Sequence, residues 1–477
     1  MGGHQNNSRY YCKVCMSQFY SHAKRASHQA ECAQHGLQTI KFPKENSFQA
    51  NPAQYAMPYC FYVVADFETI CSSLLDTELV DSNRSYTVYE EVHKQYCISW
   101  ALISPKGSIE VGYFVWDDAI ERFVNRMLDL SEELMKLINV RGEEIIMNSE
   151  ELTAHYLATK CYVCKQYFTV SNPKVIHHSH LAEGVSPSDR LYIGSPCRNC
   201  NLRLKHKLEL PILFHNSTIK RCRAKKINCT AKNSEKIMCL QLDNIRFMDS
   251  MMHLPSGLKS LVDSLRQDGL HKFPITAKYF KKHGNYLEKI IAKQRMCYEY
   301  LSPETLQKGF PTRDKFFSKL HKKPLSIEDY CHAFQIYVLF GCKNLGEYVK
   351  IYCILDTLLL ADVFESYREE ALKQFQIDPL YFVLGSSFTF ACALKLTNVR
   401  LDYIKDPDIL LKFKESIRGG LTGLNTRYVE ANIPNTETFN QSEPISEIAY
   451  YDITSLWALY ITLHIEGRTI DHAAQPH

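Results

Sequence analysis

The feature that most constrains the fold is a pair of Cys-x2-Cys motifs, Cys161 with Cys164 and Cys197 with Cys200. Two such motifs can bring four thiolates into a tetrahedron around one zinc ion, so we expect residues 158–206 to fold as a closed zinc module. The sequence contains 18 cysteines, which could instead indicate disulfides. Seven of them have zinc-like spacing, and no apolar signal segment opens the sequence. We therefore expect zinc sites in a reducing, intracellular compartment.

The first 45 residues contain a second set of potential zinc ligands, which are Cys12, Cys15, His28 and Cys32. A short hairpin carrying the first pair and a helix carrying the second would form a zinc finger. The last ligand is cysteine rather than histidine, and His22 or His35 could substitute for a member of the set. A segment this short has no core without metal, so metal binding would drive its folding. Whether it contacts DNA or protein stays open.

An α/β region with acidic residues at the end of a strand follows. The apolar run 59–65 predicts a buried strand that ends in Asp66-Phe67-Glu68. The strand period of two places both carboxylates on one face, where they can share metal ions. Further strands are expected at 96–103 and 210–214, an amphipathic helix at 117–138 and a mainly helical tract at about 255–375. Within that tract, Tyr352 and Asp356 share a helix face, where they could orient a water and bind a metal.

Composition bounds the class of protein without identifying it. An apolar content of 45% and a charged content of 23% are ordinary for a globular chain, and 477 residues suggest about three domains. No apolar run is long enough to cross a bilayer, so no membrane partner is expected. The net charge of +4 does not establish a nucleic-acid partner. The basic run 220–226 is either a solvated loop or a phosphate-contacting one.

The elements at 66–68 and 352–356 resemble the first and third motifs of a DnaQ-like 3′–5′ exonuclease, which has an RNase H-like fold. The middle motif would begin near His215-Asn216. In that family an aspartate five residues after the asparagine completes the metal cage, and here Arg221 occupies its position. A guanidinium removes one ligand and repels the metal. The resemblance therefore implies the exonuclease fold, while Arg221 departs from the pattern needed for activity.

Two later motifs extend this resemblance. Gly419 and Gly420 resemble the Tyr/Ile-x-Gly-Gly linker that contacts primer DNA, and glycines allow such close backbone approach. The strand carrying Asp452 resembles the first metal-binding motif of a family B polymerase palm. In this order, the motifs resemble those of protein-primed family B DNA polymerases from Polinton/Maverick transposons and related viruses. Trp457 departs from that family, which usually has tyrosine there.

The resemblance implies three parts: a zinc finger over 1–45, an exonuclease-like domain over 55–400 with its zinc-binding insertion, and the beginning of a polymerase palm over 401–477. It also implies structural zinc, catalytic magnesium, DNA and a terminal priming protein as partners, a role in DNA replication and a nuclear location. Polymerase motifs B and C have no counterpart here, so we expect no polymerisation by this chain alone. Two alternatives stay open: a degenerate transposon-derived zinc protein that binds nucleic acid, and a residual nuclease.

The zinc module has a further resemblance, to the ββα nuclease module of the endonuclease VII type. His178 would be its general base, and Asn201 would help to hold a metal. His177 stands where that family has aspartate, and imidazole is a poorer ligand than carboxylate for magnesium. The module is therefore expected to be structural, with endonuclease activity as the alternative.

Overall fold

The computed structural model divides the chain into two compact units, residues 44–403 and residues 1–43 with 404–477. The structure describes residues 10–14, 17–19, 21–34, 43–50, 53, 55, 57–73, 91–104, 109–116, 118–138, 147–178, 192–204, 207–215, 227–231, 237–318, 322–416, 430–434, 436 and 438–448.

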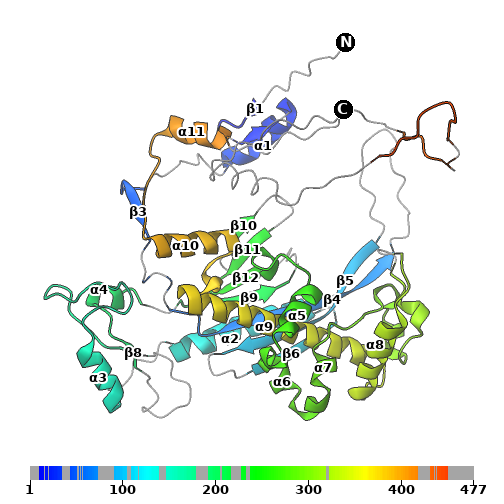
Figure 1. The fold of residues 1–477 in the computed structure, drawn as a ribbon, viewed down its shortest axis with the longest axis horizontal. Helices are drawn as coiled ribbons and strands as arrows, with labels where there is room; N and C mark the ends of the chain where they lie inside the picture. The colour runs from blue at the N-terminus through cyan, green and yellow to red at the C-terminus, as the bar shows by residue number, and fades with distance from the viewer. Residues whose placement is uncertain are drawn as a thin grey trace. The chain divides into compact units, whose positions relative to one another are not determined.

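A mixed sheet of seven strands forms the centre of unit 44–403 (Figure 1). Its strand order is β10-β11-β12-β9-β4-β5-β6. Strands β4, β5 and β6 form an antiparallel meander, whereas β9 lies parallel to β4 and β12 lies parallel to β9. The strands span Tyr62–Ser73 (β4), Glu91–Ile103 (β5), Ile109–Val115 (β6), Leu210–Phe214 (β9), Ile227–Ala231 (β10), Ile237–Leu242 (β11) and Ile245–Asp249 (β12).

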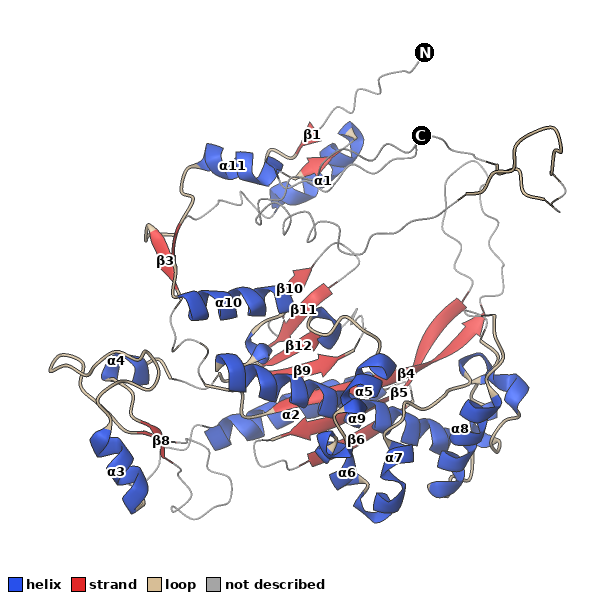
Figure 2. Cartoon of the chain, viewed as in Figure 1, coloured by secondary structure: helices blue, strands red, loops and turns tan. Residues whose placement is uncertain are grey.

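Both faces of this sheet are buried, which explains why its central strands are apolar without alternation. Along β4, Tyr62 and Val64 pack with α9, Leu345–Phe375, on one face. The residues that alternate with them, Val63 and Ala65, pack on the other face with α2, Ala119–Ile138. The result is a layer of helix on each side of the sheet (Figure 2). Strand β9 has the bounds expected from the sequence, and β4 extends beyond the expected run to include Asp66 and Glu68.

The helical tract after β12 forms most of the layer that covers the sheet on the face where α9 packs. Asn344 begins α9 by accepting a hydrogen bond from the N–H of Glu347 at 3.0 Å, as an N-cap does. Among the described helices, none combines the length and apolar character needed to cross a bilayer. The remaining helices of this tract are α5 (Leu258–Gln267), α6 (Pro274–Tyr279), α7 (Leu287–Ile290), α8 (Ile327–Leu339) and α10 (Gly385–Thr397).

Small elements complete this unit. The cysteine-rich segment contains α3 (Ser149–Leu157), the strand pair β7 (His177–His178) and β8 (Tyr192–Gly194), and α4 (Arg198–Asn201). Asn148 and Glu151 form a reciprocal capping box at the start of α3. A separate two-stranded sheet pairs β3 (Ser47–Gln49) with β13 (Arg400–Asp402).

The other unit contains a hairpin of β1 (Tyr10–Tyr11) and β2 (Gln18–Phe19), followed by α1 (His22–Gln34). It also contains α11 (Pro407–Ser416). In the described part of 430–448, Asn432 closes a loop by donating to the carbonyls of Asn440 and Glu443.

A buried ion pair lies near the end of α9, and its arginine also bonds to the segment that precedes β4. Arg368 donates to Asp378 Oδ2 at 2.7 Å and to the carbonyl of Tyr59 at 2.6 Å, and Asp378 is fully buried. Replacing Arg368 by methionine leaves this carboxylate without its cation, so we expect a loss of about 3–5 kcal/mol in unfolding free energy, measured by urea denaturation. The exposed pair Arg122–Asp118 is the control, and Arg122→Met should cost less than about 1 kcal/mol. Equal effects of the two substitutions would contradict the prediction.

Candidate functional site

Three carboxylates lie together at the boundary of the sheet and α9. Asp66 and Glu68 come from β4, and Asp356 comes from α9. One ligand oxygen from each lies within 4.8 Å of the others, which is close enough for a shared metal ion. The strand period places Asp66 and Glu68 on the same face as Tyr62 and Val64, which α9 covers. We call Asp66, Glu68 and Asp356 the carboxylate trio.

Hydrogen bonds from β5 fix the position of α9, so that Asp356 lies next to the two carboxylates of β4. Ser99 is paired with Asp66 across the sheet, and its hydroxyl donates to the carbonyl of Cys353 at 2.8 Å. The same hydroxyl is also hydrogen-bonded to Thr357, which immediately follows Asp356. The pairing of β4 with β5 shifts register directly after Glu68. Such irregularities are frequent beside functional sites, because they redirect side chains.

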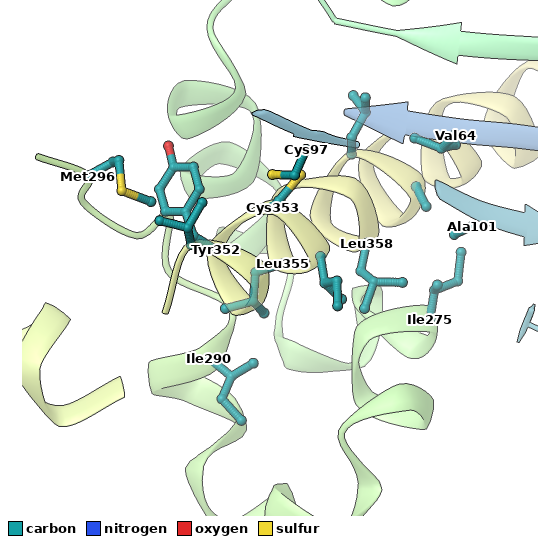
Figure 3. Close-up of a cluster of buried hydrophobic side chains, with 14 of the residues drawn as sticks. Val64, Cys97, Ala101, Ile275, Ile290, Met296, Tyr352, Cys353, Leu355 and Leu358 are labelled. Carbon is teal, nitrogen blue, oxygen red and sulfur yellow. The ribbon is translucent and has the colours of Figure 1, made fainter. Parts of the chain in front are cut away.

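Lys293 contacts the trio from the loop after α7. Its ammonium forms an ion pair with Oδ2 of Asp356 and donates to the hydroxyl of Tyr352 at 2.7 Å. The hydroxyl of Tyr352 is also 2.9 Å from that of Tyr298. Tyr352 and Asp356 therefore share a helix face, as their four-residue spacing predicts. Figure 3 shows Tyr352 extending from α9 beside Met296.

Burial shifts the pKa values of Asp66, Glu68 and Lys293. Burial raises the pKa of Asp66, while Lys293 opposes the shift. Burial and the charge of Asp66 raise the pKa of Glu68 well above its ordinary value. Burial lowers the pKa of Lys293, and the two carboxylates on β4 oppose that shift. Such perturbation by burial and specific partners is characteristic of functional sites.

The bonding of the trio's oxygens and their chemistry are suited to a divalent cation. Oδ1 of Asp356 is buried and has no hydrogen-bond partner among the described residues. A buried carboxylate oxygen without a partner is costly unless a cation or proton satisfies it. Lys293 satisfies only the other oxygen. The donor set consists of carboxylate oxygens, which suit hard divalent ions.

The parallel strands β9 and β12 end on the same side of the sheet, and a polar residue follows each of them. His215 follows β9, and its Nδ1 lies 2.9 Å from the hydroxyl of Ser250, which follows β12. Its Nε2 donates to the carbonyl of Ser256 at 3.0 Å. Asp249 accepts from the N–H of Met251 and so caps the short 3-10 helix Ser250–Met252. The other residues of the expected middle motif, Asn216 and Arg221, lie outside the described residues.

Lys293 competes with a cation for the trio, because its charge contacts a potential ligand. We expect Lys293→Met to strengthen Mn²⁺ binding at pH 8 by roughly tenfold or more, since unit charges about 4 Å apart repel by several kcal/mol at a moderate dielectric. Electron paramagnetic resonance of free Mn²⁺ measures this affinity. The control is Lys289→Met, because Lys289 is exposed and donates to Gln335. Unchanged or weaker Mn²⁺ binding by Lys293→Met would refute the competition.

The four cysteines of the zinc module come together as their spacing predicts. One sulfur from each of Cys161, Cys164, Cys197 and Cys200 lies within 4.8 Å of the others, so this cluster can hold a zinc ion. The N–H of Cys164 donates to Sγ of Cys161 at 3.4 Å, which favours a thiolate. Burial opposes ionisation of Cys197, but the backbone of Cys200 and neighbouring donors lower the pKa of Cys197 to about 7. The chemistry of this donor set is that of a closed zinc site.

The residues expected for endonuclease activity lie on two different elements of this module. His178 lies in β7, and Asn201 is the last residue of α4. His177 is stacked on Tyr162, whose hydroxyl is 2.7 Å from its Nδ1. In the part of the chain that the structure describes, His178 belongs to no group of three or more potential Cys, His, Asp or Glu ligands.

The first 45 residues contain a second cluster that can bind zinc. Ligand atoms of Cys12, His28 and Cys32 lie within 4.8 Å of one another. The last two are four residues apart on α1, so they project from the same helix face. Cys15 and the alternative ligand His35 lie outside the described residues, and Nε2 of His22 is 2.7 Å from the guanidinium of Arg25.

Lys293 and Tyr298 are the members of the site that the sequence did not predict. Both lie between α7 and α8, Lys293 in irregular chain and Tyr298 at the start of the short 3-10 helix Tyr298–Tyr300, where no periodicity indicates the direction of a side chain. The residues expected for the polymerase, Gly419, Gly420 and Asp452, lie outside the described residues. Comparisons with protein-family models, curated proteins and solved structures found no match to this chain.

Proposed function

We propose that residues 44–403 form a metal-dependent 3′–5′ exonuclease-like domain within a homologue of protein-primed family B DNA polymerases. The observation that carries this proposal is the convergence of Asp66 and Glu68 with Asp356, which lies almost 300 residues further along the chain. The sheet supports an RNase H-like fold. Its antiparallel strands β4, β5 and β6 come first in the chain, and the later strands β9 and β12 both run parallel to β4. The substrate class of the proposal is DNA.

The trio would hold Mg²⁺ through its carboxylate oxygens. Bound there, magnesium would lower the pKa of a water and stabilise charge on the leaving oxygen. The chain's own groups have separate tasks in the proposal. The hydroxyl of Tyr352 orients the water, because Lys293 and Tyr298 fix its position. Lys293 also offers positive charge to the negative phosphate.

Incubating the full chain with magnesium and a 5′-labelled single-stranded oligonucleotide tests the proposal. A ladder that shortens stepwise from the 3′ end supports it. Internal cuts that disappear in His178→Ala would instead indicate the endonuclease alternative. No cleavage in any divalent metal would overturn the nuclease.

A second candidate function is a zinc protein that binds nucleic acid without cutting it. The observation that favours it is Lys293, whose cation already contacts the trio. Binding of single-stranded DNA without magnesium, and no degradation after magnesium is added, would support this candidate. A role in DNA replication, a priming protein as partner and a nuclear location belong to the polymerase proposal and rest on the resemblance of motifs.

A further inference from the structure

The zinc module is more basic than the chain that contains it. Residues 158–206 include seven lysines and arginines and two carboxylates, a formal charge of +5, against +4 for the whole chain. Four thiolates with one zinc ion would contribute two negative charges, so the module would remain positive. The excess charge is therefore a local property of this module.

Several of these cations lack an ionic partner. Lys160, Lys165, Arg198 and Arg203 are exposed, and none forms an ion pair with a described carboxylate. Lys174 differs, because its ammonium donates to the carbonyls of α3 and of Ala158 and so joins that helix to the module. The exposed four remain available to an anionic ligand.

An exposed aromatic ring lies beside one of these cations. The side chain of Tyr167 is 66% exposed, and the ammonium of Lys160 lies 4.5 Å from the centre of its ring. Lys160 and Tyr167 are also bridged through their backbones, which keeps them adjacent. An exposed ring next to a cation offers a stacking surface for a base and a charge for its phosphate.

Lys165 brings a second positive charge close to α10. It follows Cys164 directly, and its φ of 60° belongs to the left-handed region. Its ammonium donates to the carbonyl of Tyr162 at 2.6 Å. Burial lowers the pKa of Lys395 on α10, and the nearby charge of Lys165 lowers it further. Two neighbouring ammonium groups repel each other, and a bridging anion such as phosphate relieves that repulsion.

We propose that the zinc module binds single-stranded nucleic acid, with Lys160 and Lys165 contacting phosphates and Tyr167 stacking on a base. The inference shares its class of partner with the proposed function, yet it concerns binding away from the carboxylate trio. The surface would hold the strand whether or not the trio cleaves it.

Fluorescence anisotropy of the full chain with a labelled oligo(dT), in buffer without divalent ions, tests this inference. The variant Lys160→Gln/Lys165→Asn removes two charges, and asparagine tolerates the left-handed backbone at 165. We expect affinity to fall roughly tenfold and the salt slope of log K to fall by about 1.4, or 0.7 for each lost contact. Tyr167→Ala should weaken binding on the order of tenfold.

The matched control is Lys281→Gln/Lys308→Gln, which removes two exposed charges outside the module. Its affinity should stay within about twofold of the original chain, and zinc content establishes that every variant retains the module. Equal losses in the two double variants, or no binding by the original chain, would overturn the inference. Cleavage of a dinucleotide with magnesium is measured separately. If cleavage fails while the module variants still weaken binding, only the proposed nuclease is refuted.

Discussion

Replacing Asp356 by asparagine is expected to reduce magnesium-dependent release of nucleotides from a single-stranded 3′ end by on the order of a thousandfold. The substitution preserves side-chain size but removes a charged ligand from a buried site, where the metal's contribution to transition-state stabilisation is several kcal/mol. Asp66→Asn should have a comparable effect, because the carboxylates of Asp66 and Asp356 belong to the same trio of potential metal ligands. The measurement is the rate of shortening of a 5′-labelled oligonucleotide under single-turnover conditions.

Glu369→Gln is the matched control for this loss. Glu369 lies on the same helix, α9, but is exposed and belongs to no group of potential metal ligands in the described chain. Its rate should stay within about twofold of the original chain. A measurable nuclease rate that Asp356→Asn leaves unchanged would show that the trio is not the reaction centre.

Removing zinc from the four-cysteine cluster is expected to unfold the module while the seven-stranded sheet persists. The small cluster formed by the cysteines with Val163 and Leu204 has few other apolar members. Metal binding must therefore supply most of the folding free energy, and structural zinc sites typically supply about 10–16 kcal/mol. In Cys197→Ser/Cys200→Ser, one zinc equivalent should disappear, and trypsin should cut within residues 158–206.

The control substitutions are Cys229→Ser and Cys331→Ser, because both cysteines are exposed and lie outside the clusters. Their zinc content and trypsin pattern should match those of the original chain. Elemental analysis measures the zinc, and mass spectrometry locates the cuts. Full zinc content after loss of Cys197 and Cys200 would exclude this cluster as a binding site.

The trio illustrates how far the sequence predicts a site. The period of a strand places Asp66 and Glu68 on one face, and the period of a helix places Tyr352 and Asp356 on another. Neither period specifies that the two faces meet. Their meeting depends on buried contacts such as the hydrogen bond from Ser99 to the carbonyl of Cys353, which links residues 254 positions apart.

The two residues of the site that the sequence did not predict are also positioned by contacts between distant segments. Lys293 lies in irregular backbone and Tyr298 begins a single 3-10 turn, so the direction of both side chains follows from packing of this segment and not from a repeat. A lysine in such a loop is ordinarily solvated. Its ion pair with Asp356 exists because the fold buries both partners together.

By itself, the sequence determined which four cysteines of the module come together, the apolar strands β4 and β9, and the shared face of Tyr352 and Asp356. These are short-range properties, because a ligand spacing, an apolar run or a four-residue interval depends only on neighbouring residues. Only the tertiary structure decided that β4 and α9 bring three carboxylates within 4.8 Å and that Lys293 contacts one of them. Those contacts join distant segments, and the burial of both sheet faces is what holds the segments together.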